Sequence, residues 1–312
     1  MSRYINPYTD FGFKKLFGSE LNKDLLIGFL NALLEEAKQL PDDEIIDLKY
    51  LNSEQLGRTK YDRKAVFDVL CETEKGAKFH VEMQNVFQEF FIDRTIYYST
   101  FPIQDMAKKD SVEEGRWNFE LQRLYSVNIL DFTFNDKNND NKQNVNEISD
   151  DDLLHCVMLK NIKTNKIFSD KLVFIYLEMP KFNKAIEECK TFYDKWLFVL
   201  SNLTNLMERP KELQERVFKR LFEQAEIATF TIDEYNAYEE SLKNYLDIAN
   251  GMVAAEKRGV EKGRAEGRAE GIVTGEKQAK LAIARTLKSL GKMTIEEIAV
   301  ATKLTVDEIS KI

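Results

Sequence analysis

Two carboxylates, Asp68 and Glu82, are spaced so that they could act together. They lie in two segments of alternating apolar residues, 65–73 and 77–84, and a short loop that contains Gly76 joins these segments. This pattern is typical of a β-hairpin. Strand pairing about the centre of the loop sets the two acids opposite each other, with their Cβ atoms about 5 Å apart. The like charges repel each other, and a Mg²⁺ or Mn²⁺ ion held by both carboxylates would remove that repulsion.

Gln84 and Asp62 are further polar candidates near the two acids. Gln84 follows Glu82 by two positions, so both side chains point to the same face of a strand, and the amide could contact a water or a phosphate oxygen. Asp62 precedes the first strand and is either an alternative acid or an ordinary surface residue. Acids on the solvent face of a hairpin are also common, so the pattern alone leaves both a metal site and a plain exposed hairpin open.

The elements around the hairpin must hold it in place. The other face of the hairpin is expected to join the core, because its facing pairs are all apolar: Cys71 with Phe79, Val69 with Val81, and Phe67 with Met83. Apolar periodicity predicts helices at 21–34, 93–109 and from 192 onward, and strands at 45–48, 124–134, 153–159 and 172–178. The Asn- and Asp-rich stretch near 135–152 cannot bury apolar area and is expected to be a mobile loop.

The composition changes near the C-terminus. Glycines recur every four residues from Gly259 to Gly275 in a charged segment, which indicates a solvated helix or linker, or else close helix packing in an oligomer. A capping-box pattern then opens a short helix at Thr294, and a second short helix follows. The spacing is similar to a helix-turn-helix. However, Asp307 and Glu308 begin the second helix, where a DNA reader would need other side chains, so a small packing module is favoured.

The overall charge limits the choice of partners. The formal net charge is -8, yet residues 256–292 contain ten Lys or Arg against five Glu. Any contact with nucleic acid must therefore come from local patches. Three cysteines without CxxC spacing and two histidines argue against a disulfide scaffold or a Cys- and His-based zinc site. No apolar run reaches the length of a membrane span, and no signal peptide is recognisable at the start, so a cytoplasmic protein is expected.

Several motifs together resemble the PD-(D/E)xK nuclease family transposases, also called recombination-promoting nucleases. The resemblance extends over nearly the whole chain, including the Gly-Arg-Ala-Glu repeat. It rests on these residues: Asp10-x-x-Phe13-Lys14-x-Leu16-Phe17, Phe67-Asp68-Val69, Val81-Glu82-Met83-Gln84, Arg94-x-x-x-Tyr98, Leu177-Glu178-Met179-Pro180-Lys181-Phe182 and Trp196.

The resemblance implies a fold and an activity. The expected fold is α/β, with a restriction-endonuclease-like mixed central sheet flanked by helices in residues 1–250. A helical C-terminal extension, 251–312, would carry the glycine repeat and a small helical hairpin and could mediate homo-oligomer formation. The expected activity is Mg²⁺-dependent (or Mn²⁺-dependent) cleavage of DNA. The alternatives are a catalytically weak or inactive nuclease fold that acts as a DNA-binding or assembly protein, and a nuclease directed at RNA.

The resemblance also assigns roles to single residues. Asp68 and Glu82 match the two metal-binding acids of the motif, and Gln84 stands where its lysine usually is, a substitution that is typical of this branch. Asp10 matches an acid on the first helix that completes such sites. Lys14 is a candidate for contact with DNA or an exposed lysine, and Arg94 is a candidate for contact with a phosphate or with Glu82.

Overall fold

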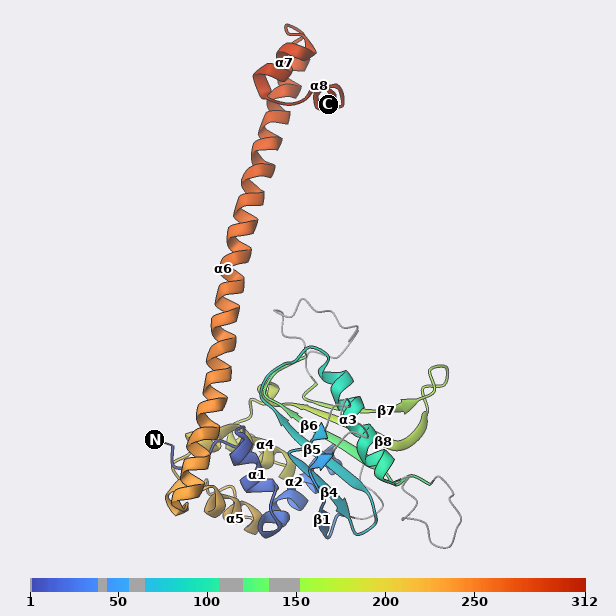
Figure 1. The fold of residues 1–312 in the computed structure, drawn as a ribbon, viewed down its shortest axis with the longest axis vertical. Helices are drawn as coiled ribbons and strands as arrows, with labels where there is room; N and C mark the ends of the chain where they lie inside the picture. Colours follow the sequence, from blue (N-terminus) through green and yellow to red (C-terminus); the bar gives the residue numbers. More distant parts are fainter. Residues whose placement is uncertain (1, 39–43, 56–64, 107–119, 135–151) are drawn as a thin grey trace. The chain divides into compact units, whose positions relative to one another are not determined.

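The computed structural model describes residues 2–38, 44–55, 65–106, 120–134 and 152–312 (Figure 1). Asp62 lies outside these residues, and so does the predicted loop near 135–152 apart from its last residue. The chain divides into two compact units, Met1–Leu246 and Asp247–Ile312. Both acids of the predicted hairpin belong to the first unit.

Six strands form the central sheet of the first unit, in the spatial order β1-β4-β5-β6-β8-β7. Their bounds are β1 (Leu48–Tyr50), β4 (Val69–Thr73), β5 (Lys78–Gln84), β6 (Leu124–Leu130), β7 (Leu154–Lys160) and β8 (Ile167–Glu178). Strands β5, β6 and β8 run parallel, and the outer pairs are antiparallel. A separate pair consists of β2 (Glu54–Gln55) and β3 (Ala65–Val66). This mixed sheet with flanking helices confirms the predicted restriction-endonuclease-like fold.

Helices cover both faces of the sheet (Figure 1). The larger core lies on one face, where β5 contributes Phe79, Val81 and Met83, and where Trp196 is fully buried. The helices of this core are α1 (Asp10–Phe17), α2 (Lys23–Glu36), α4 (Phe192–Asn202) and α5 (Arg216–Ala225). Helix α3 (Phe91–Met106) lies on the other face, where Phe91 packs with Leu130 and Tyr176 of a smaller cluster.

The alternating directions of the side chains along β5 therefore determine which face of the sheet its polar residues occupy. Because successive side chains of a strand point to opposite faces, His80, Glu82 and Gln84 point away from the large core and toward the face that α3 covers. Burial of the apolar side chains, at roughly 1.5–3 kcal/mol each, fixes this register, since a slip of one residue would exchange the two faces.

The structure confirms the predicted hairpin register from Val69, which pairs with Val81, through Cys71, which pairs with Phe79. Gly76 has a positive φ of 83° in the turn, as its loop position requires. One part of the prediction is wrong. The first strand is interrupted between β3 and β4, and Phe67 does not join the core face opposite Met83.

The interruption has a local cause. The backbone N–H of Phe67 donates a 2.8 Å hydrogen bond to the carbonyl of Ser53, so this residue leaves the hairpin ladder. Its side chain turns to the α3 side, where it packs with Leu70 and lies 4.4 Å from the ring of His80. Asp68 thus stands one residue beyond the last paired position rather than within the ladder.

Other boundaries also shift. The strand predicted at 45–48 is found at Leu48–Tyr50, and β6 ends at Leu130 rather than at 134. Strand β8 begins at Ile167, five residues before the predicted start at 172. Helix α3 begins at Phe91, two residues early.

In the second unit, the four-residue glycine repeat lies within a helix, α6 (Ile232–Leu290). Helices α7 (Ile295–Thr302) and α8 (Val306–Ser310) pack with the end of α6 around a small core that includes Ala284, Ile298 and Ile309. The predicted capping box is present, because Thr294 Oγ1 accepts from the N–H of Glu297, whose carboxylate accepts from the N–H of Thr294.

Candidate active site

Asp68 directly precedes β4 and is held by the neighbouring strand β5. Its Oδ2 accepts a 2.9 Å hydrogen bond from the backbone N–H of Met83 on β5. Burial, together with the charges of Glu82 and Asp10, raises the pKa of Asp68 to about 6, although the hydrogen bond from Met83 and the ammonium of Lys14 oppose the rise. The three charged groups thus act electrostatically on Asp68, so the fold gathers the predicted acids although no ladder pair joins Asp68 to Glu82.

Glu82 is almost completely buried on β5, with 3% of its surface exposed. Its Oε2 accepts a 2.8 Å hydrogen bond from the amide of Gln84. Its Oε1 lies 2.9 Å from Nε2 of His80, yet the two atoms are not aligned for a hydrogen bond, and Oε1 has no other protein donor. A buried carboxylate oxygen without a donor is unfavourable by roughly 1–3 kcal/mol or more, so this atom is available to a cation.

Gln84 connects Glu82 to helix α3. While its amide nitrogen donates to Glu82, its amide oxygen accepts a hydrogen bond from the guanidinium of Arg94. Arg94 Nη2 also lies 3.9 Å from Glu82 Oε2, and its other terminal nitrogen donates to Gln88. The structure therefore places Arg94 beside Glu82, as one of the two sequence interpretations expected, and makes Gln84 a bridge between them.

Asp10 and Lys14 come to the same region from α1. Asp10 is the first residue of this helix, where a negative charge is favourable, and Thr9 caps the helix through the N–H of Gly12. Asp10 forms a 2.6 Å ion pair with Lys14, and both side chains are well exposed. Lys14 is thus neither isolated nor a purely surface group, because its charge acts on Asp68.

His80 is a neighbour whose importance the sequence did not indicate. Its predicted pairing with Leu70 is confirmed, but its ring is fully buried, between Phe67 and the carboxylate of Glu82. Asn128 of β6 lies beside Glu82 in the sheet and is also fully buried. A histidine two positions before an acid on the same strand face was the available signal, because the period of two brings such side chains together.

The donor set suits a magnesium ion only in part. Within the described ranges, no group of three or more His, Cys, Asp or Glu side chains is arranged to hold a metal. The hairpin offers two carboxylates, those of Asp68 and Glu82, as candidate hard oxygen ligands. Mg²⁺ usually keeps several waters and binds one or two carboxylates together with substrate phosphates. The residues fit a site of that kind, in which solvent and a phosphate complete the coordination.

A second acid, Glu178, ends β8 in the same row of the sheet as Gln84, with Leu130 between them. It lies in the motif at 177–182 that contributes to the family resemblance. Glu178 is fully buried and accepts from His155 Nε2 at 2.6 Å and from Lys181 at 2.8 Å. Burial raises the pKa of Glu178, but the bonds from these partners outweigh burial and hold the pKa below its usual value. Both carboxylate oxygens of Glu178 have hydrogen-bond partners in the protein, so this acid stabilises the fold locally.

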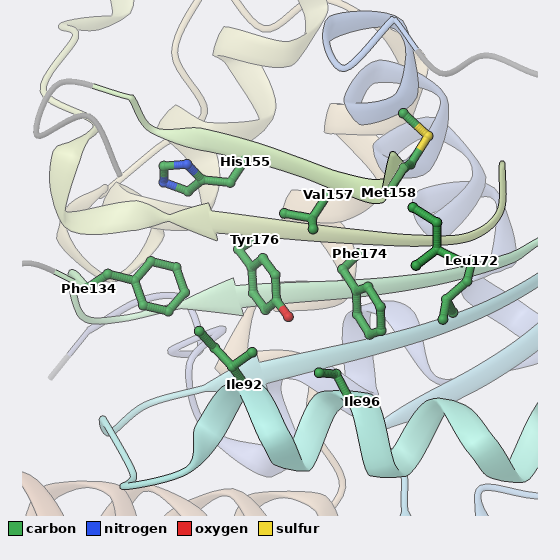
Figure 2. A pocket seen from close by; sticks show the side chains of 10 residues that line it. Ile92, Ile96, Phe134, His155, Val157, Met158, Leu172, Phe174 and Tyr176 are labelled. Atoms are coloured by element: carbon green, nitrogen blue, oxygen red, sulfur yellow. The ribbon is translucent and has the colours of Figure 1, made fainter. Parts of the chain in front are cut away.

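A cavity of about 410 Å³ lies between α3 and the last two strands (Figure 2). Ile92 and Ile96 of α3 face Phe174 and Tyr176 of β8 across it. The lining is apolar except for His155 and the hydroxyl of Tyr176, and it includes none of the predicted site residues. The cavity therefore offers only one histidine and one hydroxyl as polar groups among its lining side chains.

A mixed sheet that brings two acids together at an antiparallel hairpin defines a nuclease-like fold of the PD-(D/E)XK type. The model of one family, described as PD-(D/E)XK nuclease family transposase, matches residues 7–255, and the chain belongs to this family. The matched range contains every predicted site residue. No curated protein and no solved structure matches the chain. No helix in the described ranges is long and apolar enough to cross a membrane.

Proposed function

We propose that the protein is a metal-dependent endonuclease that hydrolyses phosphodiester bonds in DNA. The observation that carries this proposal is the convergence of Asp68 and Glu82, one with a pKa raised to about 6 and the other with a buried oxygen that lacks a protein donor. Both features mean that two ionised carboxylates at this position destabilise the protein alone, and that a bound cation would stabilise them. Membership of a nuclease family supplies the substrate class.

Asp68 and Glu82 would hold Mg²⁺ or Mn²⁺, which when bound polarises the phosphate and lowers the pKa of an attacking water. The N–H of Met83 orients Asp68, and the amide of Gln84 orients Glu82, so both carboxylates keep one oxygen directed by the protein. Asp10 is close enough to add negative charge and to orient a water through its exposed carboxylate.

The positive charge of the site comes from arginine and lysine in this proposal. Both ends of the Gln84 amide are already engaged, which leaves it little capacity to bind a water or a phosphate. Arg94 lies next to Glu82 and has five N–H donors, some of which can contact a phosphate oxygen as charge develops. Lys14 is a second cation near Asp68.

Supercoiled plasmid provides the direct test. The full-length protein should nick plasmid in Mg²⁺ or Mn²⁺ and not in EDTA, and Asp68→Asn or Glu82→Gln should abolish nicking. An RNA substrate assayed beside the plasmid tests the RNA-directed alternative. Plasmid binding without metal-dependent nicking would refute the proposal and would indicate a DNA-binding or assembly protein instead.

A further inference from the structure

Strands β7 and β8 continue beyond the sheet as a hairpin. Pairing of β8 with β6 starts only at Leu172, so the preceding part of β8 pairs with β7 alone. The register shifts on both sides of Leu159, which bends the hairpin where it leaves the sheet. We call residues 159–171 the hairpin arm; it projects past the neighbouring strands in Figure 1.

The turn of the hairpin arm is well defined. The carboxamide oxygen of Asn161 accepts from the N–H groups of Lys163 and Thr164, both at 3.0 Å. The N–H of Asn161 donates to the carbonyl of Lys166 at 2.9 Å, and Asn165 takes a left-handed φ of 54°. Asparagine tolerates that conformation better than most residues. The arm therefore presents its side chains from a preformed turn.

The arm is a basic patch on an acidic protein. It carries four lysines and a single acid, Asp170, which is already paired with the guanidinium of Arg123. All four ammonium groups belong to exposed residues, and none lies within ion-pair distance of a carboxylate in the described ranges. The arm lysines are Lys160, Lys163, Lys166 and Lys171. Because the whole chain has a net charge of -8, this local surplus is what a contact with phosphate requires.

Large apolar side chains stand among the arm lysines. Ile162 at the turn is 99% exposed, and Phe168 on the returning strand is 80% exposed. Exposed side chains of this size that alternate with lysines are typical of a surface that contacts both the charged backbone and the apolar base edges or steps of nucleic acid.

We propose that the hairpin arm binds the duplex of the DNA substrate, an inference that rests on the proposed nuclease function. The major groove of B-DNA admits a two-stranded β-ribbon, which allows the lysines to reach the phosphates on either side. Glu82 lies in the row of Tyr176, nine residues after Ile167, or about 30 Å along β8. This distance is close to one turn of DNA, about 34 Å, so the arm and the acids can contact the same duplex.

The test measures DNA binding apart from cleavage. Binding of a fluorescent duplex to the full-length protein is followed by anisotropy in EDTA, across 50 to 200 mM salt. One variant replaces the four arm lysines with glutamine. The control variant makes the same change at four exposed lysines elsewhere in the first unit: Lys49, Lys211, Lys219 and Lys243. Unchanged melting temperatures verify that both variants fold.

The expected result is a change in salt dependence for the arm variant only. Loss of four phosphate contacts should reduce the slope of log K against log salt by about 3 to 4. Between 50 and 200 mM salt, the affinity of the wild type should then fall roughly 100-fold more than that of the arm variant. Ile162→Ser with Phe168→Ser should weaken binding at every salt concentration and leave the slope unchanged.

Two results would overturn the proposal. Equal salt slopes for the arm and control variants would remove the arm from the DNA contact, even if wild-type protein nicks plasmid. Binding to vesicles that contain anionic lipid is measured for the same variants. If the arm variant loses vesicle binding but keeps its DNA binding, the arm contacts a membrane surface instead. Failure of the nuclease proposal is separate, because it would appear as absent metal-dependent nicking while the arm lysines still determined the salt slope.

Discussion

Replacing Asp68 with asparagine should make the metal-free protein more stable at neutral pH. The pKa of this carboxyl is raised from 3.8 to about 6, chiefly by burial and then by the charge of Glu82. At about 1.4 kcal/mol per unit, ionised Asp68 lowers the free energy of unfolding by about 3 kcal/mol. Asparagine removes the charge, and its carboxamide oxygen can still accept from the N–H of Met83.

The sign and the pH range follow from the direction of the shift. Below the unfolded pKa, both states hold the proton and Asp68 carries no penalty. As pH rises from about 4 to 6, the unfolded state ionises first, so the wild-type protein loses stability until the folded pKa is passed. The gain from Asp68→Asn should therefore be about 3 kcal/mol at pH 8 and about 1 kcal/mol at pH 4.5.

Urea unfolding in EDTA at the two pH values measures this difference, and at pH 8 the melting temperature should rise by roughly 6–12 °C. Asp170→Asn is the matched control, because its bond from Arg123 holds the pKa of Asp170 below the usual value. That control should be less stable than wild type at pH 8. A gain at position 68 that is absent at pH 8, or that is equal at both pH values, would refute the reasoning.

The remaining predictions concern metal, charge and the C-terminal unit. Mn²⁺ should raise the melting temperature of the wild type by mass action, and Glu82→Gln should abolish that shift. Arg94→Ala should slow plasmid nicking by about 100-fold, while Gln84→Lys should be tolerated alone and should partly restore nicking to Arg94→Ala. Gln84→Leu should lose activity, since leucine cannot bridge to Glu82. Deletion of residues 251–312 should leave the Mn²⁺ shift intact but weaken DNA retention or self-association, as gel filtration and a salt series of binding would report.

The hairpin could be predicted from sequence because the residues that determine it are close together along the chain. Alternating apolar residues on both sides of a glycine loop fix the register, and Val69 and Val81 pair as expected. The interruption at Phe67 could not be predicted in the same way, because it depends on a hydrogen bond to Ser53, which reaches the hairpin from a preceding segment. The sequence therefore predicted the register of the hairpin from Val69 onward, and it missed how Asp68 is held.

The bridge from Gln84 to Arg94 illustrates a different limit. Ten residues separate the two, and their contact depends on the turn between β5 and α3 as well as on the length of an arginine side chain. The pattern along one strand predicts that the amide of Gln84 contacts water or phosphate. In the fold, the nitrogen of this amide donates to Glu82 and its oxygen accepts from Arg94. The hairpin arm could not be predicted for a similar reason: the apolar pattern starts the last strand at 172, whereas β8 begins at Ile167 and first pairs with β7 alone.

Position 84, where the resemblance to the motif would place a lysine, holds a glutamine in this chain. Helices α1 and α3 cover opposite faces of the sheet, and each brings one cation toward the acids: Lys14 acts on Asp68, and Arg94 lies beside Glu82. Each acid therefore has its own positive neighbour, and neither neighbour is carried by the strand of the motif. We infer that position 84 is free to hold an amide because the charge that a lysine would supply already comes from the two helices. If this is correct, the rate of nicking depends on Arg94 and Lys14 more than on any charge at position 84.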